Sequence, residues 1–158
     1  PDLEGNAMEK ARYVHRVVNM SVFADDTGLE IEVLEGLPGV HSARFAGEDK
    51  NSDANIDKVL AMMENAGNRR ARFRTVIALI HYGREYIFEG IVNGKIILEK
   101  RGNGGFGYDP VFVPEGHERT FAEMTLNEKN RMSHRARAFE KLRNFLVQYR
   151  KPDNKDTL

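Results

Sequence analysis

The stretch from residue 70 to residue 99 alternates apolar and polar side chains with the period of a β-strand. Three strands are predicted within it, at residues 71–81, 85–92 and 95–98. Tyr82-Gly83-Arg84 separates the first two, and Asn93-Gly94, a strong hairpin signal, separates the last two. The chain therefore has to fold around a sheet whose faces other segments must cover.

Three segments with the apolar spacing of a helix can provide this cover. They lie at residues 5–18, 52–66 and 133–149. Their expected inward residues are Ala7, Ala11, Val14 and Val17 or Val18; Ile56, Leu60 and Met63; and Ala136, Phe139, Leu142, Leu146 and Tyr149. The alternation of helices and strands predicts an α/β fold with a mixed β-sheet flanked by helices. A chain of 158 residues predicts a single domain over residues 1–150, with a polar tail at residues 151–158.

Two adjacent carboxylates form the first candidate site. Residues 21–24 and 29–33 read as short strands, and Asp25-Asp26-Thr27-Gly28 lies between them. Carboxylates at the end of a strand suit Mg²⁺, which prefers oxygen ligands. An acidic β-turn explains the same four residues equally well.

A glycine-rich loop at residues 101–110 forms the second candidate site. It contains Phe106-Gly107-Tyr108-Asp109, in which the glycines allow close approach of a ligand and the two rings could stack on a base. Asp109 could accept hydrogen bonds from a base or a ribose. The alternative is a hairpin loop with Phe106 or Tyr108 packed in the core.

A basic segment at residues 127–137 forms the third candidate site. Lys129, Arg131 and Arg135 surround Ser133, which is a predicted helix N-cap followed by His134. The N–H groups and dipole at a helix start favour anions such as phosphate. An exposed basic helix with a capping serine is the competing interpretation.

Composition excludes several classes of function. The chain has 24 Lys and Arg against 24 Asp and Glu, so its zero net charge argues against a nucleic-acid partner and a membrane surface. It has no cysteine, no apolar run of membrane-spanning length and no signal-peptide pattern in its first residues, which predicts a cytoplasmic protein. His15, His41, His81 and His117 lack metal-ligand spacing, so a non-metal role is expected for each.

Four blocks, in order, resemble the inosine triphosphate pyrophosphatase family, whose members act on non-standard purine nucleotides. They are Ala-Asp-Asp-Thr-Gly-Leu-Glu from Ala24, Pro-Gly-Val-His-Ser-Ala-Arg-Phe-Ala-Gly from Pro38, Gly-Phe-Gly-Tyr-Asp-Pro-Val-Phe from Gly105 and Lys-Asn-Arg-Met-Ser-His-Arg-Ala from Lys129. The resemblance extends from Leu3 to about Leu146. It implies an elongated mixed-sheet α/β fold, a homodimer, and Mg²⁺-dependent hydrolysis of inosine, deoxyinosine or xanthosine triphosphate to monophosphate and pyrophosphate.

The resemblance also implies roles for individual residues. Asp26 would be the metal ligand and proton acceptor, with Asp25 beside it as a second metal ligand. Residues expected to contact the nucleotide are Thr27, Phe106, Gly107, Tyr108, Asp109, Lys129, Ser133, His134 and Arg135. A protonated Lys129 or Arg135 would donate to the 6-oxo group of the purine, whereas adenine offers a donor there. All these groups are expected to line one cleft.

The chain departs from the family pattern at three places. Thr27, His41 and Phe45 stand where the family commonly has serine and two tyrosines. A Thr-Gly-Asn-x-x-Lys phosphate-binding loop and a second metal-binding glutamate are not found before Leu3. Either this chain lacks the amino-terminal strand and phosphate loop of its protein, which we favour because every later block is intact, or it is a nucleotide-binding homologue with impaired catalysis. A pyrophosphatase of the related Maf type with another base preference is the alternative enzyme.

Overall fold

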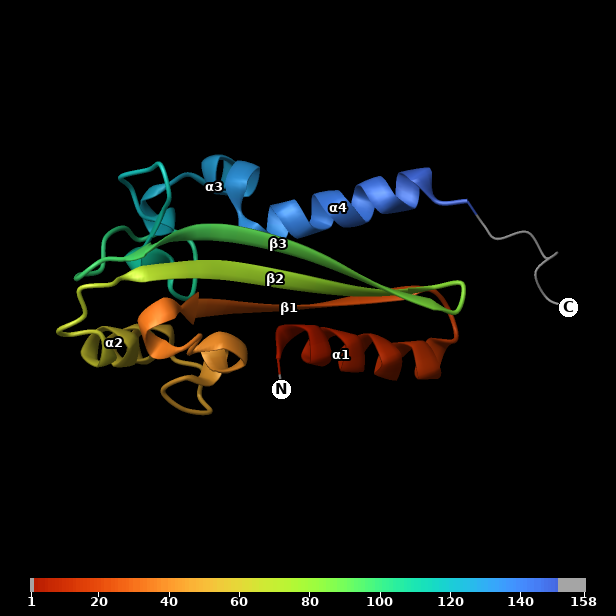
Figure 1. The fold of residues 1–158 in the computed structure, drawn as a ribbon, viewed down its shortest axis with the longest axis horizontal. Helices are drawn as coiled ribbons and strands as arrows, with labels where there is room; N and C mark the ends of the chain where they lie inside the picture. Colours follow the sequence, from red (N-terminus) through yellow and green to blue (C-terminus); the bar gives the residue numbers. More distant parts are fainter. Residues whose placement is uncertain (1, 151–158) are drawn as a thin grey trace, which may run out of the picture.

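The computed structural model describes residues 2–150, so the predicted polar tail lies outside the described residues. Four α-helices, four strands and four short 3₁₀ segments follow one another in this part of the chain (Figure 1). The α-helices are α1 (Leu3–Val18), α2 (Ser52–Met62), α3 (Leu126–Met132) and α4 (His134–Gln148). The 3₁₀ segments are η1 (Glu32–Leu34), η2 (Gly39–Arg44), η3 (Asp109–Val111) and η4 (Phe121–Glu123).

The strands form one sheet in the order β1-β2-β3-β4. Their bounds are Val22–Ile31, Arg70–His81, Arg84–Ile96 and Phe112–Pro114. The α/β class and the flanking helices are confirmed. Each neighbouring pair is antiparallel, so the expected mixture of parallel and antiparallel pairs is absent from residues 2–150.

The predicted turn at residues 25–28 is wrong. β1 runs without interruption, and Asp25, Asp26 and Thr27 pair with Ile77, Val76 and Thr75 of β2. Gly28 allows β1 and η2 to lie close together, because a Cβ atom on Gly28 would lie 2.5 Å from the carbonyl oxygen of Gly39, at the start of η2. Pairing with a long neighbouring strand overrides the turn preference of these short polar residues.

The predicted hairpin at Asn93-Gly94 is wrong as well. β3 continues through both residues and pairs with β2 as far as Lys95. A Cβ atom on Gly94 would lie 2.3 Å from the carbonyl oxygen of Val113, so this glycine makes room for β4. The other predicted turn is confirmed, since Tyr82 and Gly83 join β2 to β3 with positive φ angles.

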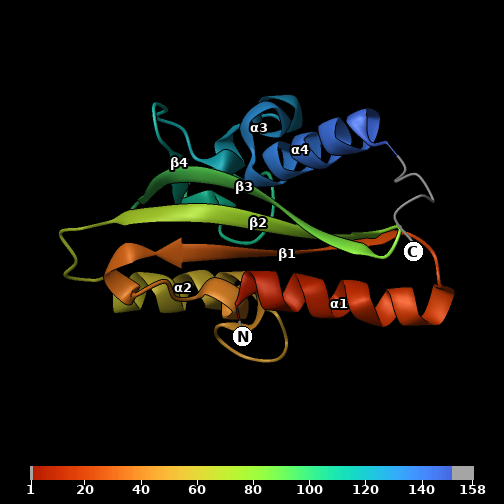
Figure 2. The same ribbon diagram turned by 45° about the vertical axis from the view of Figure 1, so that its right-hand side comes forward.

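The helices divide between the two flanks of the strongly elongated sheet. α1 and α2 lie along the β1 side of the strands, and α3 and α4 lie along the β3 side (Figures 1 and 2). Alternate residues of β2 belong to two different apolar clusters. Val76, Ala78 and Ile80 pack on α1, while Ile77 and Leu79 pack on α4. Because side chains alternate across a strand, α1 and α4 cover opposite faces of this end of the sheet.

Some expected inward residues are exposed. Val14, Val17 and Val18 of α1 and Leu146 of α4 face solvent, and the buried apolar side chains are Leu3, Ala7 and Ala11 in α1 and Ala138 and Leu142 in α4. Ile56 and Val59 of α2 and Met63, directly after it, are buried, and Leu60 is only partly buried. The helix α3 was not predicted from the sequence, because residues 126–132 carry no long apolar period. None of the helices in the described part of the chain has the length and apolar character needed to cross a membrane.

Candidate active site

Strand β1 presents its two neighbouring carboxylates to opposite faces of the sheet. Asp26 pairs with Val76, which faces α1, whereas Asp25 and Thr27 pair with Ile77 and Thr75 on the face of α4. The hydroxyl groups of Thr27 and Thr75 lie 2.8 Å apart. Within residues 2–150, β1 is one of the two edge strands of the sheet, and Asp25, Asp26 and Thr27 are half-buried there.

Asp26 lies beside a lysine that sequence reasoning did not identify. The ammonium group of Lys10, on α1, donates to Asp26 Oδ1 at 3.2 Å and to the carbonyl oxygen of Asp25 at 3.1 Å. The second carboxylate oxygen of Asp26, Oδ2, is buried and has no hydrogen-bond partner among residues 2–150. Burial of a carboxylate oxygen without a partner is costly, so a proton or a ligand at this oxygen would stabilise it.

Asp25 connects β1 to the basic helix. The guanidinium group of Arg135 donates to Asp25 Oδ2 at 2.8 Å across 110 residues of sequence. Arg135 lies in the first turn of α4, where the hydroxyl of Ser133 accepts from the backbone N–H of Ala136 as predicted for an N-cap. Asp25 and the basic segment therefore come together in space, whereas Asp26 faces α1 on the opposite side of the sheet, contrary to the expectation that all these groups line one cleft.

Asp109 organises the glycine-rich loop from inside. It is almost fully buried, and its Oδ2 accepts from the backbone N–H of Phe106 at 3.0 Å and from Lys129 Nζ at 2.5 Å. A Cβ atom on Gly105 would lie 2.1 Å from the same oxygen, so only glycine fits there. Oδ2 of Asp109 is thus engaged within the protein by the loop backbone and by Lys129.

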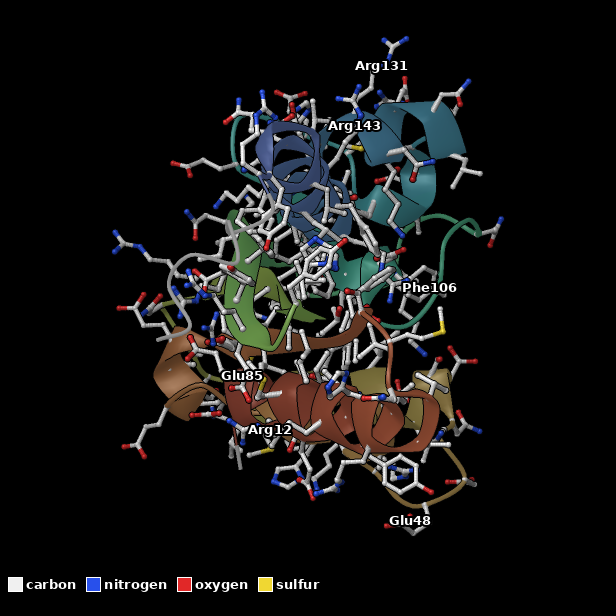
Figure 3. The ribbon with its side chains drawn as sticks, turned by 90° about the vertical axis from the view of Figure 1, so that its right-hand side faces the viewer. Arg12, Glu48, Glu85, Phe106, Arg131 and Arg143 are labelled. Atoms are coloured by element: carbon white, nitrogen blue, oxygen red, sulfur yellow. The ribbon has the colours of Figure 1, made fainter. Side chains whose placement is uncertain are left out.

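The two aromatic residues of the loop have different environments. Phe106 is 70% exposed and lies on the flank of the molecule between α3 and α1 (Figure 3), whereas Tyr108 is only 5% exposed. The ammonium group of Lys129 lies 4.2 Å from the centre of the Phe106 ring. The Tyr108 hydroxyl donates to the carbonyl oxygen of Ser42 at 2.6 Å, so its ring is not available for stacking. Gly107, with a φ of 58°, reverses the backbone between them.

His134 is a buried, neutral histidine at the start of α4. Its ring stacks on Phe73 of β2, with 4.8 Å between the ring centres. Burial, followed by the nearby charges of Lys129 and Arg135, lowers the pKa of His134 to about 3. Its Nδ1 atom is buried without a hydrogen-bond partner. At neutral pH the imidazole therefore carries no charge next to these two cations.

The carboxylates of β1 could provide only part of the ligand set of a magnesium ion. In residues 2–150 no three His, Cys, Asp or Glu side chains are grouped so that they could hold a metal ion. Asp25 and Asp26 also point to opposite faces, but Asp26 Oδ2 is free of protein partners. Mg²⁺ typically binds one or two carboxylates, several waters and substrate phosphates. An ion of this kind would take Asp26 as its carboxylate ligand and would draw its other ligands from water and substrate phosphates.

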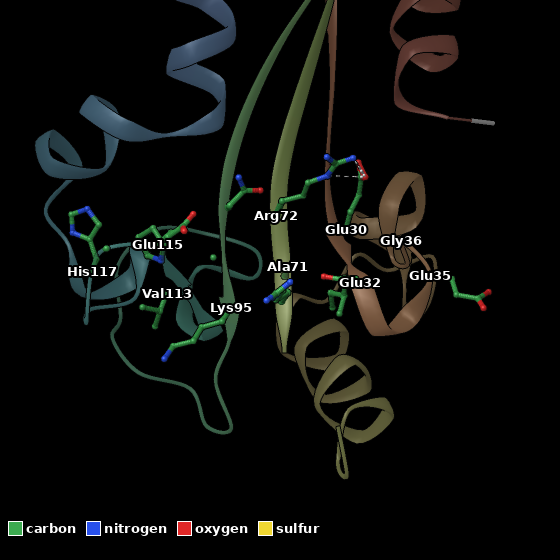
Figure 4. A pocket seen from close by; sticks show the side chains of 16 residues that line it. Glu30, Glu32, Glu35, Gly36, Ala71, Arg72, Lys95, Val113, Glu115 and His117 are labelled. Atoms are coloured by element: carbon green, nitrogen blue, oxygen red, sulfur yellow. Dashed lines mark hydrogen bonds and ion pairs between the residues drawn. The ribbon is translucent and has the colours of Figure 1, made fainter. Parts of the chain in front are cut away.

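A cavity of about 830 Å³ lies where the last residues of β1 face the ends of β2 and β3 (Figure 4). None of the predicted site residues is among the described residues that line it. Its walls come from the end of β1, η1, the adjoining ends of β2 and β3, the end of β4 and the segment after it, and they include Glu30, Glu32, Arg70, Arg72, Lys95 and His117. Acidic and basic groups are mixed there, and Arg72 is paired with Glu30 at 3.1 Å. The carboxylates of β1 and the glycine-rich loop are therefore a separate site.

The fold and this site define a helix-flanked sheet that brings a carboxylate strand, an exposed aromatic loop and a basic helix together. The same fold occurs in the Ham1 protein of Staphylococcus aureus, with a TM-score of 0.91 and 40% identity over 93% of this chain and 77% of that one. It also occurs in a HAM1 protein from Coxiella burnetii, with a TM-score of 0.90 and 39% identity over 94% of this chain and 78% of that one.

Residues 1–145 match the model of the Ham1 family. The dITP/XTP pyrophosphatase of Porphyromonas gingivalis is 55% identical over 146 residues, which cover 92% of this chain and 75% of the relative. The dITP/XTP pyrophosphatase of Bacillus subtilis is 49% identical over 146 residues, which cover 90% of this chain and 74% of the relative. The chain belongs to the Ham1 family, and the resemblance identified from its four sequence blocks is confirmed.

Proposed function

We propose that this protein hydrolyses non-standard purine nucleoside triphosphates, namely inosine, deoxyinosine and xanthosine triphosphate, to the monophosphate and pyrophosphate. The reaction would remove these nucleotides from the cellular pool. The observation that carries the proposal is the ion pair between Asp25 and Arg135, which joins the carboxylate strand to the basic helix. The names of the relatives from P. gingivalis and B. subtilis agree with this activity.

Asp26 is the proposed proton acceptor. Water attacks the α-phosphorus, the bond between that phosphorus and the oxygen bridging to the β-phosphate breaks, and pyrophosphate leaves with that oxygen. The proton of the water passes to the carboxylate of Asp26, whose Oδ2 has no protein partner. Lys10 holds the other oxygen and places a positive charge where phosphate charge accumulates.

We propose that Asp26 would hold a divalent metal, Mg²⁺, at this site. When bound, the metal would supply charge neutralisation for the pyrophosphate leaving group. Asp25, on the other face, positions Arg135 in this proposal rather than binding the metal through its side chain. Thr27 follows Asp26 in β1, on the face of Asp25, and is a further proposed substrate contact.

The base is proposed to stack on Phe106, the exposed ring of the glycine-rich loop. Lys129, behind that ring, is held by Asp109, and Arg135 and the neutral His134 lie at the start of α4. A donor from Arg135 or Lys129 to the 6-oxo group favours hypoxanthine and xanthine over adenine. A site built for one hydrogen-bond pattern can reject the wrong pattern by roughly 10⁴–10⁵.

The cytoplasm is the proposed location, and a homodimer is the proposed assembly. The absence of cysteine from the whole sequence fits a reducing compartment. A homodimer follows the family pattern, and no nucleic-acid or membrane partner is proposed, because the chain has no net charge.

Release of pyrophosphate from a panel of triphosphates tests the proposed function. With MgCl₂ present, inosine and xanthosine triphosphates should be hydrolysed far faster than those of adenosine, guanosine, cytidine and uridine. Chelation by EDTA should stop the reaction. A preference for pyrimidines would favour the Maf-type alternative, and absence of turnover with retained nucleotide binding would favour an impaired homologue.

A further inference from the structure

The motif Pro38 to Gly47 contains none of the predicted site residues, yet it lies between two parts of the site. Its central segment, η2, packs directly on β1: the Gly39 carbonyl lies so close to Gly28 that a side chain there is excluded. The backbone N–H of Leu29 donates to Ser42 Oγ at 2.9 Å, and this hydroxyl donates to the Gly39 carbonyl at 2.6 Å. Ser42 is thus fixed to the strand that carries Asp26.

The other end of the motif is anchored to α2. The side chain of Asn55, which is buried, accepts from the backbone N–H of Ala46 at 2.7 Å and donates to the carbonyl of Ala43 at 2.9 Å. Lys58 adds a hydrogen bond to the carbonyl of Phe45 at 2.7 Å. The backbone around Ser42 is therefore held from both sides.

The glycine-rich loop attaches to this anchored backbone through Tyr108. The Tyr108 hydroxyl donates to the Ser42 carbonyl at 2.6 Å, and both residues are buried, at 5% and 9% exposure. Burial also raises the pKa of Tyr108, so the hydroxyl stays protonated and remains a donor. Asp109, the next residue, accepts from the backbone N–H of Phe106. A continuous series of contacts thus leads from β1, through Ser42 and Tyr108, to the exposed ring.

We propose that Tyr108 and Ser42 are positioning residues that set the spacing between the base-binding ring of Phe106 and the carboxylate of Asp26. The inference rests on the proposed function, because it concerns how one nucleotide is held at both ends. Neither residue touches the substrate in this role. A nucleoside triphosphate reacts only when its base and its α-phosphorus occupy their sites together, and a misplacement of 1 Å in such an arrangement can cost about 100-fold in rate.

The test is the variant Tyr108→Phe, which removes the hydroxyl and keeps the ring. The kcat/KM for inosine triphosphate should fall by about 10-fold to 100-fold, while the inhibition constants of inosine and of pyrophosphate, measured separately, change by less than about twofold. Each inhibitor reports one end of the site, so this pattern distinguishes spacing from local damage. Tyr86→Phe is the matched control, because Tyr86 is half-buried against Phe145 and outside the site.

Ser42→Ala provides the second variant. It removes the acceptor of the Leu29 N–H and leaves the carbonyl that Tyr108 uses. Because both residues belong to one linkage, the double variant should be no slower than the slower single variant. Thermal melting establishes whether each variant is folded. If Tyr108→Phe is not folded, the same kinetic measurements on Ser42→Ala test the inference.

Three results would overturn the inference. One is a kcat/KM of Tyr108→Phe like that of the wild type. Another is a loss of inosine affinity equal to the loss of kcat/KM, which would make Tyr108 a direct base contact. The third is a double variant whose loss of kcat/KM equals the product of the two single losses, because independent sites would give that result. If the wild type itself does not hydrolyse inosine triphosphate, the proposed function fails, and the same variants are compared on whichever triphosphate it hydrolyses fastest.

Discussion

The adjacent residues Asp25 and Asp26 have different partners because a strand directs neighbours to opposite faces. Asp25 binds Arg135 of α4, and Asp26 binds Lys10 of α1. The sequence predicts that both acids matter but not that they are divided. Neither cation could be identified from spacing, since Lys10 is 16 residues from Asp26 and Arg135 is 110 residues from Asp25.

Replacement of Asp26 by asparagine should abolish turnover and leave nucleotide affinity largely intact. The amide cannot take the proton of the attacking water, and general-base catalysis contributes about 10²–10⁴-fold in rate. Steady-state pyrophosphate release and equilibrium binding of inosine triphosphate measure the two effects. Asp49→Asn, at an exposed position, is the matched control. Turnover near that of the wild type would remove Asp26 from the mechanism.

Replacement of Phe106 by alanine should weaken substrate binding by about 1–3 kcal/mol, because a base loses its stacking surface. The measurement is the dissociation constant for inosine triphosphate with calcium in place of magnesium. Leu98→Ala removes an equally exposed apolar side chain outside the loop, since Phe106 and Leu98 are each 70% exposed. Equal behaviour of the two variants would show that no base stacks on Phe106.

His134 should make the protein sensitive to mild acid. Its pKa is lowered from 6.5 to about 3 in the folded state, so below pH 6.5 the unfolded chain binds a proton that the folded chain refuses. Its contribution lowers the free energy of unfolding as the pH falls from 6.5 towards 3, by at most about 1.4 kcal/mol per pH unit. Urea unfolding at several pH values should show a shallower pH dependence for His134→Gln than for the wild type. Identical slopes would contradict a buried neutral imidazole.

At the level of the elements, the contact between β3 and α4 places the basic helix. A Cβ atom on Gly90 would lie 2.0 Å from the carbonyl oxygen of His134 and 2.5 Å from the backbone nitrogen of Ala138. Helix α4 can therefore lie directly on the strand only because residue 90 has no side chain. The position of Arg135 follows from this contact.

Gly90→Ala should destabilise the fold by about 1–3 kcal/mol or more, as overpacking against backbone atoms does. The free energy of unfolding in urea measures it, and kcat/KM should fall with it as α4 is displaced. Gly67→Ala is the control, since no atom lies within 4 Å of its added Cβ and its stability should be nearly unchanged. A Gly90→Ala variant as stable as this control would mean that α4 is less closely packed.

The glycines also explain which elements could be predicted. The apolar period of β2 and the N-cap Ser133 identify their elements correctly, because both signals are local. Gly28 and Gly94 indicate turns in the sequence but mark close contacts with Gly39 and Val113 in the structure. Turns and close contacts both require the absence of a Cβ atom, so the residue type alone cannot distinguish them.

For the whole molecule, four short blocks were enough to predict the family, whereas the geometry of the site needed the structure. The exposed Phe106 and the buried Tyr108 are two residues apart in one flexible-looking loop. Their exposure differs because the hydroxyl of Tyr108 donates to the carbonyl oxygen of Ser42, which is 66 residues away in the chain. The family is a property of residue identity, but burial is a property of the contacts that the complete fold creates.

The proposed homodimer should have about twice the 18.0 kDa mass of the chain. Light scattering coupled to size-exclusion chromatography, over a range of protein concentrations, measures this mass. A monomer at every concentration would contradict the assembly, while leaving the proposed activity to be tested independently.

The alternation in β1 has a further consequence for how the protein tolerates change in length. One residue inserted between Val22 and Asp25 that shifted the strand by a single position would exchange the faces of the two acids: Asp25 would take the place of Asp26 beside Lys10, and Asp26 would take the place of Thr27 on the face of α4. The composition would hardly alter, yet each acid would lie on the wrong face. In this segment a gain or loss of one amino acid should therefore be more harmful than most substitutions.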